Sequence, residues 1–168
     1  MNLGEATVIE DDTELPLPHA QHTQVKWTAP GAHNYKLNFD GATFAEDGIV
    51  GIGVVIRNEA GLVMASLSQR IPLPASVIEV EALAARRAME FALELGFDNV
   101  ILEGDSKVLV KTLKDGRNTL THYGNLTADI FFLTSHFSRV QFSFVRRQCN
   151  RLAHSLARRA SISQQMSV

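Results

Sequence analysis

Hydrophobic and polar positions alternate with a period of two in several short stretches, the pattern of half-buried β-strands. In the clearest stretch, "YKLNFDGA", Tyr35, Leu37 and Phe39 face one way and the residues between them face the other. An Asp-Gly turn is expected to end that strand, at Asp40. Short connections join the first three stretches, so we expect antiparallel neighbours. Strands are predicted at 35–42, 49–58, 62–71, 99–105 and 140–145.

Elsewhere the apolar positions follow the helical period of 3.6. The first helix ends before Gly96, a typical C-terminal glycine. Because a strand that returns after a helix is usually parallel to its neighbour, 99–105 should lie parallel to 35–42. The order βββαβααβα predicts an α/β fold with a mixed five-stranded sheet. Helices are predicted at 76–95, 106–114, 124–137 and 150–162.

One carboxylate lies on the apolar face of a predicted amphipathic helix, where a charged side chain is unusual. At 100° per residue, Glu79 falls among the charged residues of helix 76–95, whereas Glu81 falls in the middle of its apolar face. An unpaired buried carboxylate is costly, so it needs a cation, a hydrogen-bond network or a metal. The pattern therefore favours Glu81 over Glu79 as a site residue.

Two further carboxylates, Asp40 and Asp105, lie at the carboxyl ends of the predicted strands 35–42 and 99–105. If those strands are parallel neighbours, both carboxylates emerge at one sheet edge, where α/β proteins gather their functional groups. Taken singly, Asp40 could belong to an ordinary turn and Asp105 could cap the following helix. Taken with Glu81, they would repel one another unless a cation such as Mg²⁺ or Mn²⁺ neutralised them.

Composition adds the domain organisation. The chain has 168 residues, 45% of them hydrophobic, and a single cysteine, which fits one soluble domain in a reducing compartment. Residues 1–25 hold five acids, no Lys or Arg and no periodicity, and are expected to form a disordered acidic leader. We expect the domain to span 26–163, followed by a flexible tail at 164–168. With no secretory or transit signal evident, we expect the cytoplasm or nucleus and no membrane association.

Basic residues concentrate toward the C-terminus. Six arginines and no acid occur from Arg139 onward. Such a face favours a phosphate-bearing partner, although a solvated helix face has the same composition. An acidic leader docked on this face, or on a partner, is a further interpretation.

Five motifs in order resemble type 1 ribonuclease H domains, most closely the RNase H-like domains of plants that are related to those of non-LTR retroelements. The resemblance runs from about Trp27 to Ala160 and implies helices on both faces of the sheet. The motifs are "WTAPGAHNYKLNFDGA" (27–42), "GIGVVIRNEAG" (51–61), "VEALAARRAMEFALELG" (80–96), "VILEGDS" (100–106) and "VRRQCNRLAHSLAR" (145–158).

That family holds two divalent metal ions, Mg²⁺ or Mn²⁺, with four acidic residues. By resemblance, the first three match Asp40, Glu81 and Asp105. The fourth lies four residues after an asparagine that matches Asn150, and there this chain has His154. The resemblance implies that Asp40 bridges both ions, that Glu81 and Asp105 hold the second, and that His154 completes or tunes the first. All four are candidate catalytic and metal residues.

A histidine at an acidic position leaves three interpretations open. In the first, His154 is a metal ligand or a proton shuttle, because neutral imidazole binds Mn²⁺ or Zn²⁺, whereas Mg²⁺ prefers oxygen. In the second it contacts phosphate, and in the third it is an incidental surface histidine. Helix projection places His154 on the side of Arg151 and Arg158, available to the site. The core side is expected to hold Leu152, Ala153, Leu156 and Ala160.

The resemblance implies an endonuclease, a type 1 RNase H that hydrolyses the RNA strand of RNA–DNA hybrids. The alternative is a catalytically weak or inactive module that binds hybrid or another nucleic acid, suggested by His154 and by Gln148, where family members often have an acid. We expect a monomer. The expected nucleic-acid contacts are Lys107, Lys111, Lys114, Arg117, Arg147, Asn150, Arg151 and Arg158.

Overall fold

The computed structural model describes residues 25–117 and 120–162. The predicted acidic leader, apart from Val25, and the predicted tail lie outside these residues. The strands are β1 (Tyr35–Phe44), β2 (Ile49–Arg57), β3 (Val63–Pro72), β4 (Asn99–Gly104) and β5 (Arg139–Phe144). The α-helices are α1 (Val77–Glu94), α2 (Lys107–Asp115), α3 (Gly124–Thr134) and α4 (Arg151–Arg159). Two short 3-10 turns are η1 (Ala45–Asp47) and η2 (Arg147–Cys149).

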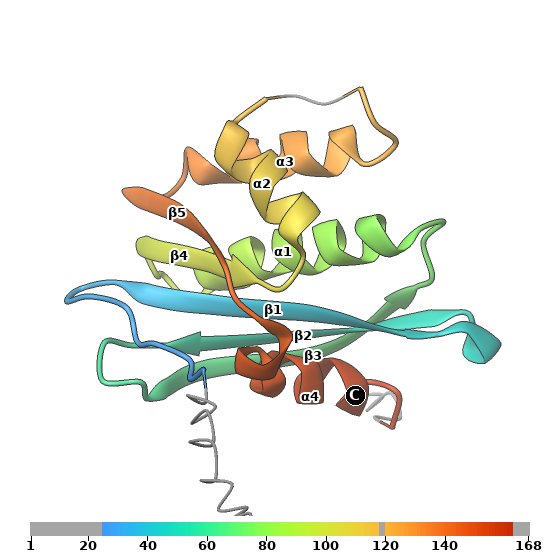
Figure 1. Cartoon of the computed structure of the whole chain (residues 1–168), viewed down its shortest axis with the longest axis horizontal. Coiled ribbons are helices and arrows are strands. Elements are labelled where there is room, and N and C mark those ends of the chain that lie inside the picture. Colours follow the sequence, from blue (N-terminus) through green and yellow to red (C-terminus); the bar gives the residue numbers. More distant parts are fainter. Residues whose placement is uncertain (1–24, 118–119, 163–168) are drawn as a thin grey trace, which may run out of the picture.

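The strands form one sheet in the order β3-β2-β1-β4-β5. β1 pairs antiparallel with β2 and parallel with β4, and β4 pairs parallel with β5. Figure 1 shows α1, α2 and α3 on one side of the sheet and α4 on the other. The predicted α/β class, the mixed five-stranded sheet and the helices on both faces are confirmed.

The two faces of the sheet are packed differently. Leu37 and Phe39 of β1 are fully buried in the apolar core that α1 covers. On the opposite face, α4 lies directly on glycines of β2, since a Cβ on Gly53 would come within 2.0 Å of the carbonyl oxygen of Ala153. The glycines therefore allow the backbone of α4 to approach the sheet closely.

This close approach corrects one prediction for the last helix. Leu152, expected on the core side, is 41% exposed. Ala153 and Ala160 are buried as expected, and Ala157, which was not expected there, is buried with them, because only short side chains fit between α4 and Gly51 and Gly53. The helix is also shorter than 150–162.

The first strand also differs from its prediction. β1 does not end in a turn at Asp40 but continues to Phe44, with Asp40 paired opposite Gly53 of β2. Gly41 is needed for packing rather than for a turn, because a Cβ there would lie 2.3 Å from a methyl group of Val80 in α1. Among the described residues, no helix has the length and apolar character that crossing a membrane requires.

Candidate active site

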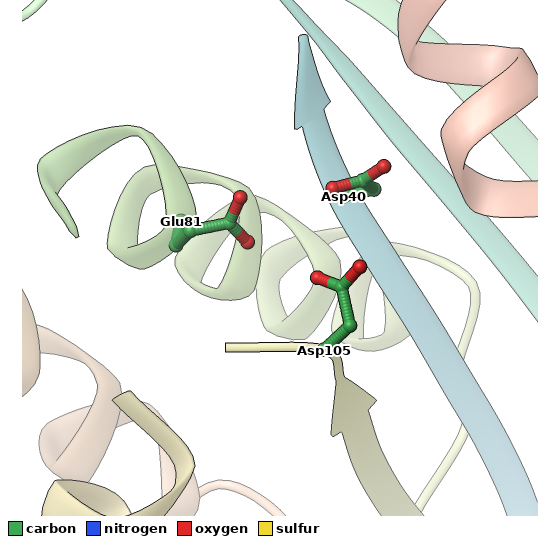
Figure 2. Close-up of side chains that lie close together, drawn as sticks. All are labelled: Asp40, Glu81 and Asp105. Carbon is green, nitrogen blue, oxygen red and sulfur yellow. The ribbon is translucent and has the colours of Figure 1, made fainter. Parts of the chain in front are cut away.

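Three carboxylates from three different elements meet on the sheet. Asp40 lies within β1, Asp105 directly follows β4, and Glu81 projects from the first turns of α1. One oxygen from each lies within 4.8 Å of the others. Figure 2 shows the three side chains directed toward one another. The parallel pairing of β1 with β4, which runs up to Asn38 and Glu103, brings the two aspartates to the same place.

Of the three carboxyl groups, Glu81 has the least favourable environment for a negative charge. Its Oε2 atom is buried and has no hydrogen-bond partner among the described residues. Burial, and then the charges of Asp40 and Asp105, raise the pKa of Glu81 to about 8, although Arg147 opposes the shift. A divalent cation would satisfy the unpartnered oxygen and remove the repulsion, so the donor set fits a metal.

Asp40 is held in place from two sides. Its side chain accepts a hydrogen bond from the backbone N–H of Gly41 at 2.9 Å, and its Oδ2 lies 2.7 Å from Nδ1 of His154. Burial and the charge of Asp105 raise the pKa of Asp40, while His154 and Gly41 act in the opposite direction. Asp40 is 1% exposed, so a ligand can contact its carboxylate only from within the site.

His154 lies beside the carboxylate cluster, as a site residue would. When Asp40 is ionised, Nδ1 carries the shared hydrogen and Nε2 stays available to a metal, a water or a phosphate. The side chain is 40% exposed. Because its contact with Asp40 spans 114 residues of sequence, the structure disfavours the interpretation of an incidental surface histidine.

Asp105 is not the cap of the following helix. Ser106 is the N-cap of α2, and its Oγ accepts a hydrogen bond from the backbone N–H of Leu109. Asp105 instead has Nε of Arg147 3.5 Å from its Oδ2, with the Arg147 side chain 83% exposed. The capping explanation for this aspartate is therefore removed.

Asn150 fixes the start of α4 against the sheet. Its Nδ2 donates to the carbonyl oxygen of Phe39 at 2.9 Å, and its own carbonyl accepts from the backbone N–H of His154 at 3.1 Å. Asn150 thereby links the residue before Asp40 to His154. With 1% of its surface exposed, Asn150 has no surface to offer nucleic acid, which argues against the contact expected for it.

A buried polar network, which was not predicted from the sequence, continues from Asn150. Asn38 donates to Glu103 at 3.0 Å and to Asn150 at 3.4 Å. Its Oδ1 accepts from the Trp27 indole and from Arg57, at 3.0 and 2.9 Å. The alternation along β1 was the available signal, because it places Lys36 and Asn38 on the face that Asp40 occupies.

The remaining expected nucleic-acid contacts are exposed side chains. Arg147 flanks the carboxylate cluster, and Nζ of Lys107 lies 5.4 Å from the centre of the Phe144 ring. Their role in binding stays a prediction. The exposed cations are Lys107, Lys111, Lys114, Arg117, Arg147, Arg151 and Arg158.

Comparisons place this geometry among known proteins. A family model described as reverse transcriptase-like matches residues 38–160. The structure is similar to RNase H1 from Halobacterium salinarum, with 27% identity over 77% of this chain and 98% of that one and a TM-score of 0.70. It is also similar to the N-terminal RNase H domain of rv2228c from Mycobacterium tuberculosis, with 26% identity over 76% and 98% of the two chains and a TM-score of 0.65.

A third similar structure is LC11-RNase H1, isolated from compost, in complex with an RNA/DNA hybrid. It shares 22% identity over 77% of this chain and 99% of that one, with a TM-score of 0.66, and supports the fold alone. A search of curated proteins gave no significant match.

Proposed function

Because the chain belongs to the reverse transcriptase-like family and has a ribonuclease H-like fold, we propose that it is a metal-dependent endonuclease that hydrolyses the RNA strand of RNA–DNA hybrids. One observation carries the proposal: Asp40, Glu81 and Asp105 converge within 4.8 Å, although they come from three separate parts of the sequence. Similarity to an RNase H1 over 98% of its length supports the same reaction class.

Asp40, Glu81 and Asp105 would hold two ions, Mg²⁺ or Mn²⁺. When bound, such ions supply an activated water and stabilise the leaving 3′ oxygen of an in-line displacement. The unpartnered Oε2 of Glu81 is the observation that favours a cation here. The closeness of three carboxylates gives the same preference, because without a cation their charges oppose one another.

The side chains around the cluster would orient the reaction. Asp40, held by Gly41 and His154, keeps its carboxylate fixed in the site. His154 would serve as a ligand or as a proton shuttle through Nε2. Arg147, exposed beside Asp105, would offer its guanidinium to the scissile phosphate.

Binding would depend mainly on the phosphate backbone. The exposed cations of α2, η2 and α4 would make affinity fall with salt and vary little with sequence. Selection of the RNA strand would come from its 2′-hydroxyl groups. We propose that the chain acts as a monomer in the cytoplasm or nucleus.

A second candidate function is a binding module that has lost turnover. The contact between His154 and Asp40 favours it, since at 2.7 Å the imidazole competes with an ion for Oδ2, one of the two oxygens of that carboxylate. This candidate predicts hybrid binding without cleavage. It also predicts little change in affinity when Asp105 becomes asparagine.

Cleavage of a labelled RNA–DNA hybrid tests the proposal. Wild type should cut the RNA strand in Mg²⁺ or Mn²⁺, and Asp105→Asn should lower the rate by at least ~100-fold, because a lost metal carboxylate costs several kcal/mol of transition-state stabilisation. Asp115→Asn, which changes an exposed aspartate at the end of α2, is the matched control and should cut normally.

The metal dependence and His154 distinguish the two candidates. Activity in Mn²⁺ alone, extended to Mg²⁺ by His154→Asp, would identify His154 as a ligand. Folded wild type that binds hybrid but cuts it in neither metal would reject the endonuclease and support the binding module.

A further inference from the structure

A cavity of about 550 Å³ lies between the segment before β1, the end of β2 and the start of α4. We call it the Trp27 cavity; its lining holds three cations and no acidic residue. Its first three residues, 25–27, lie outside the part matched by the family model, and the other five lie within it. The lining residues are Val25, Lys26, Trp27, Arg57, Gln148, Cys149, Arg151 and Leu152.

The wall of the cavity is fixed to the body of the protein. The indole N–H of Trp27 donates to Asn38 at 3.0 Å, and the thiol of Cys149 donates to the carbonyl of Val25 at 3.1 Å. Lys36 donates to the carbonyl of Thr28 at 2.6 Å. A site held by such bonds is already formed before a ligand arrives, which lowers the cost of binding.

The cations in the lining are only partly compensated: the carboxylate of Glu103 acts on Arg57, but it already forms an ion pair with Lys36. The guanidinium of Arg57 stacks 3.5 Å from the centre of the Trp27 ring, and its Nη2 donates to Asn38. Its Nε is buried and has no hydrogen-bond partner among the described residues. Lys26 and Arg151 are exposed and form no ion pair within the described part of the chain. An oxyanion would relieve this unpaired positive charge.

The position of the cavity suits a long ligand that also reaches the carboxylate cluster. Arg57 pairs with Lys36, four residues before Asp40 in β1. At ~3.3 Å per residue this separation is roughly 13 Å, or about four base steps of a duplex. Arg151 also continues the exposed cations that begin with Arg147 beside Asp105.

We propose that the Trp27 cavity binds a backbone phosphate of the nucleic acid several nucleotides away from the site of cleavage. The proposal rests on the proposed function. Arg57, Lys26 and Arg151 supply the charge, and the contact carries no sequence information, because every nucleotide presents the same phosphate.

The fluorescence of Trp27 reports on binding in the Trp27 cavity, because it is the only tryptophan in the chain. A fluorescein-labelled 16-base-pair RNA–DNA hybrid is titrated into the full chain with Ca²⁺ in place of Mg²⁺, and intact substrate is verified on a gel. Trp27 emission should change saturably, with the midpoint that the anisotropy of the hybrid gives.

A double variant, Lys26→Gln with Arg151→Gln, tests the charge. We expect affinity to fall about 5- to 10-fold and the slope of log affinity against log salt to lose about one unit, the amount for one phosphate contact. The control is Arg139→Gln, an exposed arginine at the start of β5 that does not line the cavity. It should leave both quantities nearly unchanged.

Three results would overturn the proposal. If hybrid binds and is cut in Mg²⁺ or Mn²⁺ while Trp27 emission and the double variant show no effect, the cavity is not a phosphate site and the proposed function stands. If hybrid does not bind at all, both fail. If only the change of Glu5, Glu10, Asp11, Asp12 and Glu14 to their amides alters Trp27 emission, the occupant is this chain's own acidic segment.

Discussion

The two faces of β1 are built from neighbouring residues and have opposite chemistry. Leu37 and Phe39 are fully buried in an apolar core under α1. Lys36, Asn38 and Asp40, which alternate with them, are also buried, at 8%, 0% and 1% exposure, but on the face that carries α4. One strand therefore contributes both the packing of the core and the polar side chains of the site.

The apolar face of β1 contributes mainly to the stability of the fold, whereas the polar face positions the side chains of the site. On the α1 face, burial of apolar surface is favourable without directional contacts. On the α4 face, each buried polar group needs a partner with good geometry, so Asn38, Glu103 and Asn150 form one connected network. That network orients the chain on either side of Asp40. We expect substitutions on the first face to change mainly stability, and substitutions on the second to change mainly activity.

The largest expected effect on stability is on the apolar face. Leu37→Ala should lower the free energy of unfolding by about 2–5 kcal/mol, because it leaves a cavity in a fully buried site. Urea denaturation followed by circular dichroism measures the change, and Val63→Ala, at a 53% exposed position, should stay within about 0.5 kcal/mol of wild type. Equal losses of unfolding free energy in both variants would contradict the role assigned to the apolar face of β1.

A smaller effect, of opposite sign, is expected at Glu81. Its pKa is about 8 in the folded protein against 4.5 in the unfolded chain, so the folded state holds an extra proton between these values. Metal-free stability should therefore be greatest near or below pH 4.5 as far as this group is concerned, and should fall as pH rises toward 8.

Thermal melts in EDTA at pH 5 and pH 8 measure this effect. Glu81→Gln should remove most of the fall and raise the melting temperature at pH 8 by at least about 3 °C, since 1 kcal/mol corresponds to roughly 2–4 °C for a domain of this size. Adding Mg²⁺ should stabilise wild type more at pH 8 than at pH 5, because the ion competes with the proton. The same slope in Glu79→Gln and Glu81→Gln would contradict the assignment.

A stability effect of similar size, with a larger effect on catalysis, is expected at Asn150. Asn150→Ala should cost about 1–2 kcal/mol, because it leaves the carbonyl of Phe39 without its side-chain donor and the amide of Asn38 with Glu103 as its remaining acceptor. It should also lower kcat for hybrid cleavage more than it raises KM, since His154 loses its fixed position beside Asp40. Asn125→Ala, an exposed position in α3, is the control. An unchanged kcat in a folded Asn150→Ala protein would show that the network supports stability alone.

The fold and the three carboxylates could be predicted because their signals are local. Period-two and period-3.6 patterns gave the element order, and Glu81 was identified by its place on an otherwise apolar helix face. His154 was noticed through resemblance rather than through any pattern of its own. The exposure of Leu152 and the burial of Asn150 were not predictable, because both depend on how closely α4 approaches Gly51 and Gly53.

The sequence by itself determined which residues could carry chemistry here: it placed one acid on a buried helix face and two beside parallel strands. Only the tertiary structure decided that Asp40 contacts His154, that Asn150 is buried against β1, and that Trp27 lines a cationic cavity. The physical reason is distance along the chain. Periodicity reports the environment of a residue within one element, whereas these contacts join elements more than 100 residues apart and form only when the sheet and α4 have packed together.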